Sequence, residues 1–420
     1  MNSYKKYLFP VIFLTVTILF SIIGFKQAEV IIIGPEFHEK EYFKEELANL
    51  SEELNISIKY KVVNDPESYI IENPNSKISI ALIPNPQAVT NLANRGKIYS
   101  LDNIVIDGDN LKGLYPSHLT NIVTHNNSIY SGWLRLFPNS LIWYDISKLN
   151  KYPEVDFTNF ESLLNSTKEL ADKNISPWCA GSESAASTGW IQTNWMEDIL
   201  LTKYGPVIYD KWSRLEIAAS NVKIYSTLNL LGDFIFYPSM IENGHPEIYY
   251  REFRNLPRRL LDENYECFLS WSGHYFKYYT PEEYKYKEDF GVIKLPSITY
   301  QDSIVGIGDT LVLIENNQDS VKTLQALLSK NFGEVWAQKH DSEFISANKN
   351  FNYSLINNSL TLYEFEITHA ALKNDMFRYD ASEIMARPIG ANLLWKMLIE
   401  YIKQGEDSLV QLLNKLDKEI

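Results

Sequence analysis

Cysteine and histidine are scarce in this sequence, which holds two Cys and seven His among 420 residues. No Cys-x-x-Cys spacing occurs, and His274 is the only histidine close in sequence to either cysteine, so a zinc site is disfavoured. Basic residues are also few: 39 Lys and Arg stand against 53 Asp and Glu, giving a net charge of −14 and a pI near 5.1. This charge argues against nucleic acid as a partner and leaves neutral or cationic ligands open.

The common hydrolase motifs are missing. Gly181-Ser-Glu-Ser-Ala185 has Glu where a nucleophile elbow has serine, and His38-Glu39 lacks the second histidine of a zinc-protease helix. Paired carboxylates remain open, because Glu183, Asp309 or Asp380 could act as acid and base of a glycosidase if they converge in one cleft.

Cofactor and metal motifs are incomplete in the same way. Gly306-Ile-Gly308 lacks the third glycine of a dinucleotide fingerprint and lies late in the chain. Asp107-Gly-Asp-Asn110 begins like a calcium loop but has Lys112 where that loop requires glycine. We therefore expect neither a cofactor nor a metal ion.

What the sequence does contain is apolar and aromatic residues. At 420 residues and 45% apolar content, the chain suits two domains or one bilobed unit. Aromatic residues make up 13%, and seven of the nine tryptophans fall between Trp133 and Trp271. Rings in excess of what a core needs usually line a binding surface, so we expect an aromatic binding wall in the middle of the chain.

The N-terminus reads as an export signal. Lys5 and Lys6 precede an uncharged stretch of 18 residues from Leu8 to Phe25. Residues 1–28 are either a cleaved signal peptide or a retained anchor, and the positive-inside rule places the body outside the cytoplasm. Without Lys5, Lys6 and Lys26 the body keeps 36 basic and 53 acidic residues, a charge near −17.

Strands alternate with helical stretches after residue 29. Val30–Ile33, residues 56–63 and Ile78–Ile83 read as strands, and residues 36–54 read as a helix. This alternation predicts an α/β unit with a mainly parallel sheet. Ligands of such sheets bind beyond the carboxyl ends of the strands, so the loops holding Glu36 and Asn85-Pro-Gln87 are candidate ligand-facing segments.

The two cysteines can be interpreted in three ways. In an exported chain an even pair predicts a disulfide, here Cys179 with Cys267, closing a loop of about 88 residues. The other readings are two unpaired buried thiols and, less favoured, a zinc site.

One long segment resembles a known family. The runs from Pro177 to Trp190, from Gln192 to Leu200 and from Tyr204 to Trp212 resemble the extracytoplasmic solute-binding proteins of carbohydrate ABC transporters, most closely those that import α-glucosides. Weaker matches extend the resemblance over the body, in segments 94–102, 139–144, 308–309, 344–349 and 377–395. The low cysteine content and the many asparagines resemble cyanobacterial members, which import glucosylglycerol, sucrose or trehalose.

The resemblance implies a bilobed α/β fold with hinge strands and a central ligand cleft. It assigns residues 29–137 and 302–345 to lobe 1, and residues 138–301 and 346–420 to lobe 2. It also places Cys179 and Cys267 where this branch tends to carry a pair. It implies a monomeric, non-enzymatic receptor that delivers a carbohydrate to a membrane permease.

The resemblance further implies a set of ligand-binding residues. They combine aromatic faces for sugar rings with polar side chains for hydroxyl groups. The set comprises Glu183, Ser184, Gly308, Asp309, Trp190, Trp271, Arg378, Asp380, Glu36, Asn85, Gln87 and Trp133. Four of its members have stated alternatives: Glu183 could cap the following helix, Trp190 could be core, and Arg378 and Asp380 could be held in an intramolecular ion pair.

Two other functions stay open at this point. A glycoside hydrolase could use the same kind of aromatic cleft, and it would consume its sugar. A receptor for polyamines or peptides is favoured slightly by the negative charge of the body.

Overall fold

The computed structural model describes residues 29–420. The expected signal or anchor at residues 1–28 lies outside the described residues. Within residues 29–420, none of the helices combines the length and the apolar character that crossing a membrane requires.

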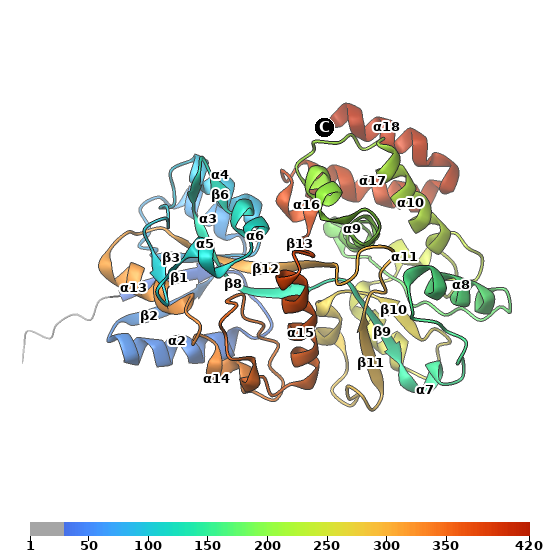
Figure 1. The fold of residues 1–420 in the computed structure, drawn as a ribbon, viewed down its shortest axis with the longest axis horizontal. Coiled ribbons are helices and arrows are strands. Elements are labelled where there is room, and N and C mark those ends of the chain that lie inside the picture. The colour runs from blue at the N-terminus through green and yellow to red at the C-terminus, as the bar shows by residue number, and fades with distance from the viewer. Residues whose placement is uncertain (1–28) are drawn as a thin grey trace, which may run out of the picture.

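A six-stranded mixed sheet forms the core of one half of the molecule, which we call the first lobe (Figure 1). Five of the strands lie in the order β13-β12-β3-β1-β2. The sixth strand, β8, also pairs with β12. The parallel neighbours β1 and β2, and β1 and β3, confirm the parallel unit expected at the start of the chain. The strands are β1 (Glu29–Gly34), β2 (Ser57–Val62), β3 (Ile80–Ile83), β8 (Ser131–Pro138), β12 (Ile304–Leu313) and β13 (Phe377–Tyr379).

Helices cover both faces of this sheet, which explains why β3 is buried along its whole length. Asp65 and Asn85 start α3 and α4 by accepting the N–H groups of Ser68 and Gln87. The helices of this lobe are α2 (Lys40–Leu54), α3 (Pro66–Glu72), α4 (Pro86–Asn94), α5 (Leu111–Leu114), α6 (Ser117–Ile122), α13 (Gln318–Leu327) and α14 (Glu334–Ala337). Two small ribbons are added by β4 (Val105–Ile106) with β5 (Asp109–Asn110) and β6 (Thr124–His125) with β7 (Ser128–Ile129).

The second lobe surrounds a three-stranded antiparallel sheet in the order β10-β9-β11. Its strands are β9 (Leu141–Asp145), β10 (Leu269–Trp271) and β11 (Phe290–Lys294). Its helices are α7 (Ile146–Leu149), α8 (Phe160–Ala171), α9 (Trp190–Ser213), α10 (Val222–Ile235), α11 (Glu247–Tyr250), α12 (Leu256–Leu261), α16 (Ala381–Ile384), α17 (Trp395–Gln404) and α18 (Leu409–Glu419). The bilobed α/β fold expected from the sequence is therefore confirmed.

The lobes meet at β8, β12 and α15 (Ser359–Lys373), which lie in the middle of the molecule in Figure 1. β8 leads directly into β9, and the N–H of Asn139 between them donates to the carbonyl of Val305 on β12 (2.8 Å). Helix α15 contributes Leu360 to the core of the second lobe and Phe365 to the core of the first. The exact lobe boundaries stay a prediction, because α15 belongs to both cores.

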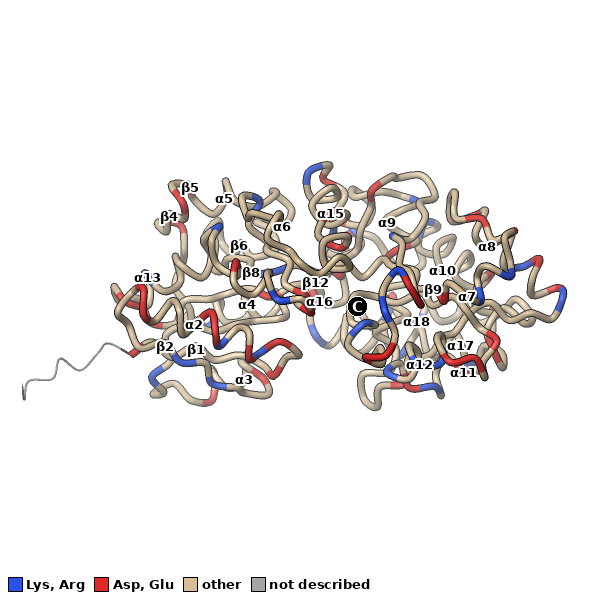
Figure 2. The backbone as a smooth tube through the Cα atoms, turned by 90° about the horizontal axis from the view of Figure 1, so that it is seen from below, with Lys and Arg blue, Asp and Glu red and all other residues tan. Residues whose placement is uncertain are grey.

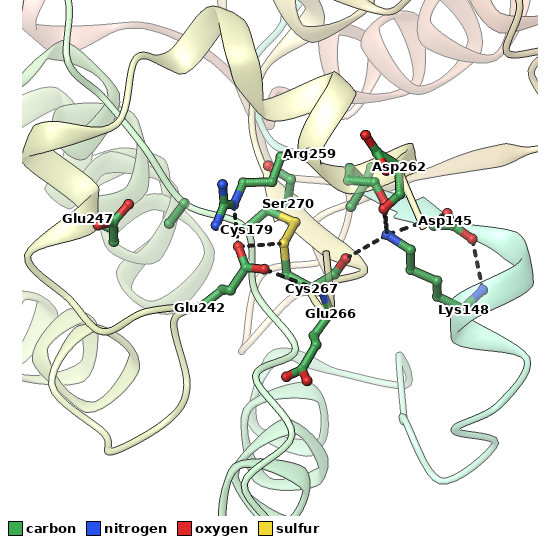
Figure 3. Close-up of a disulfide and its surroundings, with 12 residues drawn as sticks. Asp145, Lys148, Cys179, Glu242, Glu247, Arg259, Asp262, Glu266, Cys267 and Ser270 are labelled. Atoms are coloured by element: carbon green, nitrogen blue, oxygen red, sulfur yellow. Dashed lines mark hydrogen bonds and ion pairs between the residues drawn. A yellow bond between two sulfur atoms is a disulfide. The ribbon is translucent and has the colours of Figure 1, made fainter. Parts of the chain in front are cut away.

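Cys179 and Cys267 form a disulfide, as predicted, with their Cα atoms 5.2 Å apart (Figure 3). The bridge is buried in the second lobe and joins the segment before Glu183 to the start of β10. Glu242 lies beside the bridge and forms an ion pair with Arg259. The bridge therefore anchors the base of the loop that carries Glu183.

Charged residues are spread over both lobes (Figure 2). Acidic and basic residues occur along the tube in both halves, and neither sign gathers on one lobe. The negative net charge is therefore a property of the whole body.

Candidate ligand-binding site

A cavity of about 490 Å³ lies between the two lobes. The first lobe contributes the loop after β1, Arg135 of β8 and Glu343. The second lobe contributes the end of the 3-10 helix His274–Tyr279. Its lining residues are Glu36, Phe37, His38, Glu39, Arg135, Tyr278, Tyr279 and Glu343. We call this space the interlobe cavity.

The loop after β1 is held in place by a tyrosine from the neighbouring strand. The hydroxyl of Tyr60 on β2 donates to the carbonyl of Pro35 (2.6 Å). A Cβ atom at Gly34 would lie 2.4 Å from that hydroxyl, so glycine is required where the strand ends. The parallel pairing of β1 and β2 thereby fixes the position of the loop that begins with Glu36.

Arg135 supplies a positive charge to the cavity. It lies opposite Asp309 in the β8–β12 pairing, and its Nε donates to Asp309 Oδ2 (2.5 Å). Its guanidinium carbon lies 4.3 Å from the centroid of the Phe37 ring. Both charged side chains are buried, so the predicted ligand residue Asp309 serves in this structure as the counter-ion of Arg135.

Two further carboxylates, which we call the cavity carboxylates, are Glu39 and Glu343. The backbone N–H of Glu343 donates to Glu39 Oε1 (2.8 Å). Each residue is 6% exposed, and within the described part of the chain Glu39 Oε2 and Glu343 Oε2 have no hydrogen-bond partner. Burial raises the pKa of Glu39, and it raises the pKa of Glu343 to about 8 against the opposing charge of Lys277.

A charged network lies behind the cavity carboxylates and joins α15 to the second lobe. Glu364 accepts from His274 Nδ1 (2.9 Å) and from Lys277 Nζ (3.1 Å). Burial lowers the pKa of His274 to about 4 even though Glu364 opposes the shift, so this imidazole is neutral at pH 7. Lys277 forms its shorter ion pair with Glu364, and its Nζ lies 3.8 Å from Glu343 Oε1.

Aromatic rings frame the mouth of the cavity. The imidazole of His38 stacks on the ring of Tyr278, with centroids 5.0 Å apart, and this contact connects the lobes. Tyr279 continues the aromatic surface to Phe253, whose ring also contacts Trp190. The predicted ring Trp190 is therefore part of an aromatic cluster that extends from the cavity into the second lobe.

The remaining first-lobe candidates lie away from the cavity lining. Asn85 is the N-cap of α4 and accepts the N–H of Gln87 (2.9 Å), so both sit at the carboxyl end of β3. Gly308 is buried in β12 and donates its N–H to the hydroxyl of Tyr379 (3.1 Å). Of the predicted first-lobe residues, Glu36 alone lines the cavity, and Asp309 adjoins it through Arg135.

The second-lobe candidates Glu183 and Ser184 lie in one partly buried turn. Glu183 Oε1 accepts the N–H of Ala185 (2.8 Å), and the N–H of Ser184 donates to Thr188 Oγ1 (2.9 Å). Glu183 therefore caps the short helix that follows, and its role in ligand binding stays a prediction.

Four candidates are buried and have partners within the chain. Trp133 is 1% exposed and donates its indole N–H to the carbonyl of Leu119 (3.1 Å), and Trp271 is 2% exposed and donates to Asp198 Oδ2 (2.8 Å). Arg378 forms an ion pair with Asp210 (2.7 Å), and Asp380 caps α16.

The ion pair of Arg378 with Asp210 is of the kind given above as the alternative to ligand binding, whereas Asp380 caps a helix instead. The part these four side chains would play in ligand binding stays a prediction.

The sequence did not single out most of the cavity lining. Glu39, Arg135, Tyr278, Tyr279 and Glu343 come from four distant segments, and no spacing in the sequence connects them. Two weak signals existed: Glu39 follows Glu36 in the same loop, and Glu343 directly precedes the Phe344–Lys349 run of the family resemblance.

Comparison with curated proteins finds two full-length relatives. The chain is 25% identical over 397 residues to the osmoprotective compounds-binding protein GgtB of Synechocystis sp., covering 93% of this chain and 92% of that protein. It is 24% identical over 389 residues to the alpha-glucosides-binding periplasmic protein AglE of Rhizobium meliloti, covering 88% and 82%. No family model matches the chain.

Solved structures share the whole fold. The bacterial solute receptor AcbH superposes with a TM-score of 0.75 at 12% identity, over 94% of this chain and 98% of that one. Maltose-bound MalE3 of T. maritima gives a TM-score of 0.67 at 13% identity, over 94% and 100%. Sequence and fold together confirm the resemblance of this chain to the extracytoplasmic solute-binding proteins of carbohydrate ABC transporters.

Proposed function

We propose that this protein is the receptor of an ABC importer that captures α-glucosides or glycosidic osmolytes, such as glucosylglycerol, sucrose or trehalose, and delivers them to a membrane permease. The observation that carries the proposal is the interlobe cavity, which brings hydrogen-bonding carboxylates together with aromatic rings from both lobes. A cavity of about 490 Å³ falls within the size range of small-molecule sites.

The chemistry of the lining suits a sugar. Tyr278 and Tyr279 offer apolar ring surface, and the carboxylates offer acceptors for hydroxyl groups. The names of the two relatives, one for osmoprotective compounds and one for alpha-glucosides, support the narrower ligand class. In this proposal Glu36, Glu183, Ser184, Trp190 and Asp309 contribute further contacts when the lobes close on the ligand.

The proposed receptor acts outside the cytoplasm as a monomer. The N-terminal sequence supports export, and the curated relative AglE is named as periplasmic. The permease would receive the ligand as the lobes open.

A thermal-unfolding scan of residues 29–420 tests the proposal. The panel contains sucrose, trehalose, maltose, glucosylglycerol, glucose and spermidine. Ligand at one hundred times its Kd adds about 2.7 kcal/mol to the free energy of unfolding, which should raise Tm by at least about one degree. A shift with α-glucosides supports the receptor, and no shift with any sugar contradicts it.

The same samples separate a receptor from a glycosidase. After a day of incubation with sucrose, trehalose and glucosylglycerol, a receptor returns all of the sugar intact. Release of free glucose above the level of a no-protein control would contradict the receptor and support hydrolysis.

A further inference from the structure

The two tyrosines that line the interlobe cavity, Tyr278 and Tyr279, belong to the 3-10 helix His274–Tyr279. Hydrogen bonds in 3-10 helices have poorer geometry than those in α-helices, and runs longer than about four residues are uncommon. Contacts from outside the helix are therefore needed to hold both rings in place. Stacking of Phe276 on Trp143 of β9 holds its apolar side. The polar side needs partners of its own.

A single carboxylate on helix α15 supplies these partners. Glu364 is fully buried, and its Oε2 accepts from His274 Nδ1 (2.9 Å) and from Lys277 Nζ (3.1 Å). The two donors are three residues apart, so in a 3-10 helix they lie on the same side. Burial acts to raise the pKa of Glu364, but His274 and Lys277 outweigh it and hold this pKa below its ordinary value. Glu364 is thus ionised at pH 7, which strengthens both hydrogen bonds.

Contacts between rings continue from this carboxylate to the first lobe. The ring of His274 meets the ring of Tyr278 edge-on, with centroids 5.2 Å apart. Tyr278 in turn stacks on His38 of the first lobe. Glu364 itself is not among the described residues that line the cavity, so it would act on a ligand only through the side chains that it holds.

Helix α15 can place these rings accurately because it belongs to both lobes. Leu360 packs in the core of the second lobe and Phe365 in the core of the first. Between them, the hydroxyl of Thr361 donates to the carbonyl of Ser342 (2.5 Å), one residue before the chain enters the cavity lining. The helix therefore connects the tyrosines of the second lobe to the wall of the cavity that the first lobe contributes.

We propose that Glu364 is a positioning residue of the receptor: through His274 and Lys277 it holds the cavity tyrosines in place and so increases ligand affinity without touching the ligand. Rings that are ordered before the ligand arrives lose less conformational entropy when it binds. This inference rests on the proposed carbohydrate receptor and adds a residue outside the cavity to those that determine its affinity.

Calorimetric titration of the full chain with sucrose, trehalose and glucosylglycerol tests the effect on affinity. Glu364→Gln keeps an acceptor oxygen and removes the charge, so it should weaken whichever probe binds by about three- to tenfold. The double variant Glu364→Leu with Lys277→Met removes both charges together and leaves neither one buried alone, and it should weaken that probe by about tenfold or more. Glu366→Gln changes the same residue type at an exposed position of α15 and should leave the affinity unchanged.

Hydrogen exchange followed by mass spectrometry distinguishes positioning from a general loss of stability. In the unliganded double variant, the protected amides of residues 274–279 should exchange about tenfold faster or more, while those of α9 keep their original rates. Saturating sugar should restore the protection of residues 274–279, because a ligand that needs the ordered helix shifts the population toward it.

The outcomes separate the inference from the proposed function. If the original protein binds none of the sugars, the proposed function is overturned. If it binds them and the folded double variant binds within about twofold of it, the inference is overturned and the receptor stands. Unchanged exchange over residues 274–279, or faster exchange across the whole second lobe, overturns the inference in the same way. Thermal unfolding without ligand verifies folding, and if the double variant does not fold, the same criteria apply to Glu364→Gln.

Discussion

Two pairs of buried carboxylates in this molecule are used in opposite ways. Glu197 and Asp198 on α9, the α9 carboxylates, lie in the second lobe with hydrogen bonds to all four oxygens. The cavity carboxylates, Glu39 and Glu343, each keep one oxygen without a partner in the described chain. Burial raises the pKa of all four, so exposure to water does not distinguish the pairs.

The difference lies in the donors that surround them. The α9 carboxylates receive a tyrosine hydroxyl, a serine hydroxyl, an indole N–H and two backbone N–H groups, which all belong to the fold. The cavity carboxylates face a space large enough for a small molecule. We infer that the α9 pair serves stability and the cavity pair serves binding, and four substitutions test this division.

The largest effect on stability should come from Glu197→Ala. Glu197 accepts the hydroxyl of Tyr209 (2.6 Å) and the N–H groups of Ala381 (2.8 Å) and Ser382 (3.2 Å). Its removal opens a cavity and leaves the buried N–H of Ser382 without its acceptor, while Tyr209 and Ala381 keep the carbonyl of Tyr379 (3.0 Å) and the hydroxyl of Tyr209 (3.1 Å) as acceptors. The free energy of unfolding should therefore fall by roughly 3 kcal/mol. Urea unfolding followed by tryptophan fluorescence measures this change.

Glu400→Ala, at a partly exposed acidic residue that pairs with Lys415 on the next helix, is the control and should change little. A decrease of less than about 1 kcal/mol in the free energy of unfolding of Glu197→Ala would contradict the structural role of the α9 carboxylates. A large loss of sugar affinity in the folded variant would contradict it too.

Glu343→Gln should stabilise the unliganded protein at alkaline pH. Because the pKa of Glu343 is raised to about 8, its contribution to stability is complete below its unfolded value near 4.5 and is lost as pH rises to about 8. The variant has no such loss, so at pH 9 it should exceed the original protein by on the order of 1 to 3 kcal/mol, and at pH 4 by much less.

The measurement is urea unfolding of both proteins at several pH values. The charged or titratable groups that face this carboxylate are Glu39, Arg135, His274, Lys277, Tyr278 and Glu364, and they are the same in both proteins. Parallel pH profiles for the two proteins would show that Glu343 is ordinarily ionised and would contradict the prediction.

Trp271→Phe removes the indole N–H that donates to Asp198 of the α9 carboxylates and leaves the residues that line the interlobe cavity unchanged. Trp271 donates to Asp198 Oδ2 (2.8 Å), and Phe fills most of the same space. We expect a loss of about 1 to 3 kcal/mol in the free energy of unfolding and unchanged sugar affinity. A weaker sugar affinity at full stability would instead support the ligand-binding role predicted for Trp271 from the sequence.

The smallest effect should come from Glu36→Gln. Glu36 is exposed and pairs with Lys40 one helical turn ahead (2.6 Å), an arrangement that contributes little in water. The Tm of the Glu36→Gln variant should change by less than about one degree. The place of Glu36 in the cavity lining allows a modest change in sugar affinity. A Tm change of several degrees would mean that the loop after β1 depends on this ion pair.

The sequence predicted the fold better than the site. The first strands and helices followed from apolar spacing, and β1, β2, β3 and α2 form where expected. The apolar spacing predicts one helix over residues 321–338 and another over 393–416, and the structure divides both. Helix α17 ends at Gly405 (φ 89°), whereas α13 ends at Leu328 and α14 begins after Gly333 (φ 87°). Periodicity cannot show such a break when the apolar pattern continues beyond it.

The cavity was harder to predict because it depends on distant pairing. Arg135 reaches Glu39 only after β8 has paired with β12, and Tyr278 reaches His38 only when the lobes meet. Glu36 and Asp309 were found because each follows a recognisable strand or glycine. Glu343 precedes a run that was noticed for its resemblance, but nothing in its own spacing marks it as a buried acceptor.

The central place of β12 also determines when the chain can fold during its synthesis. β12 contacts β13, β3 and β8, yet residues 304–313 are made long after β1, β2 and β3. Until they arrive, β3 has an unpaired edge of apolar residues, and such an edge invites association with other chains. The first lobe therefore cannot be completed before residues 139–303, which form much of the second lobe, have been translated. A ribosome that stalls within them would carry a partial sheet with an exposed apolar edge.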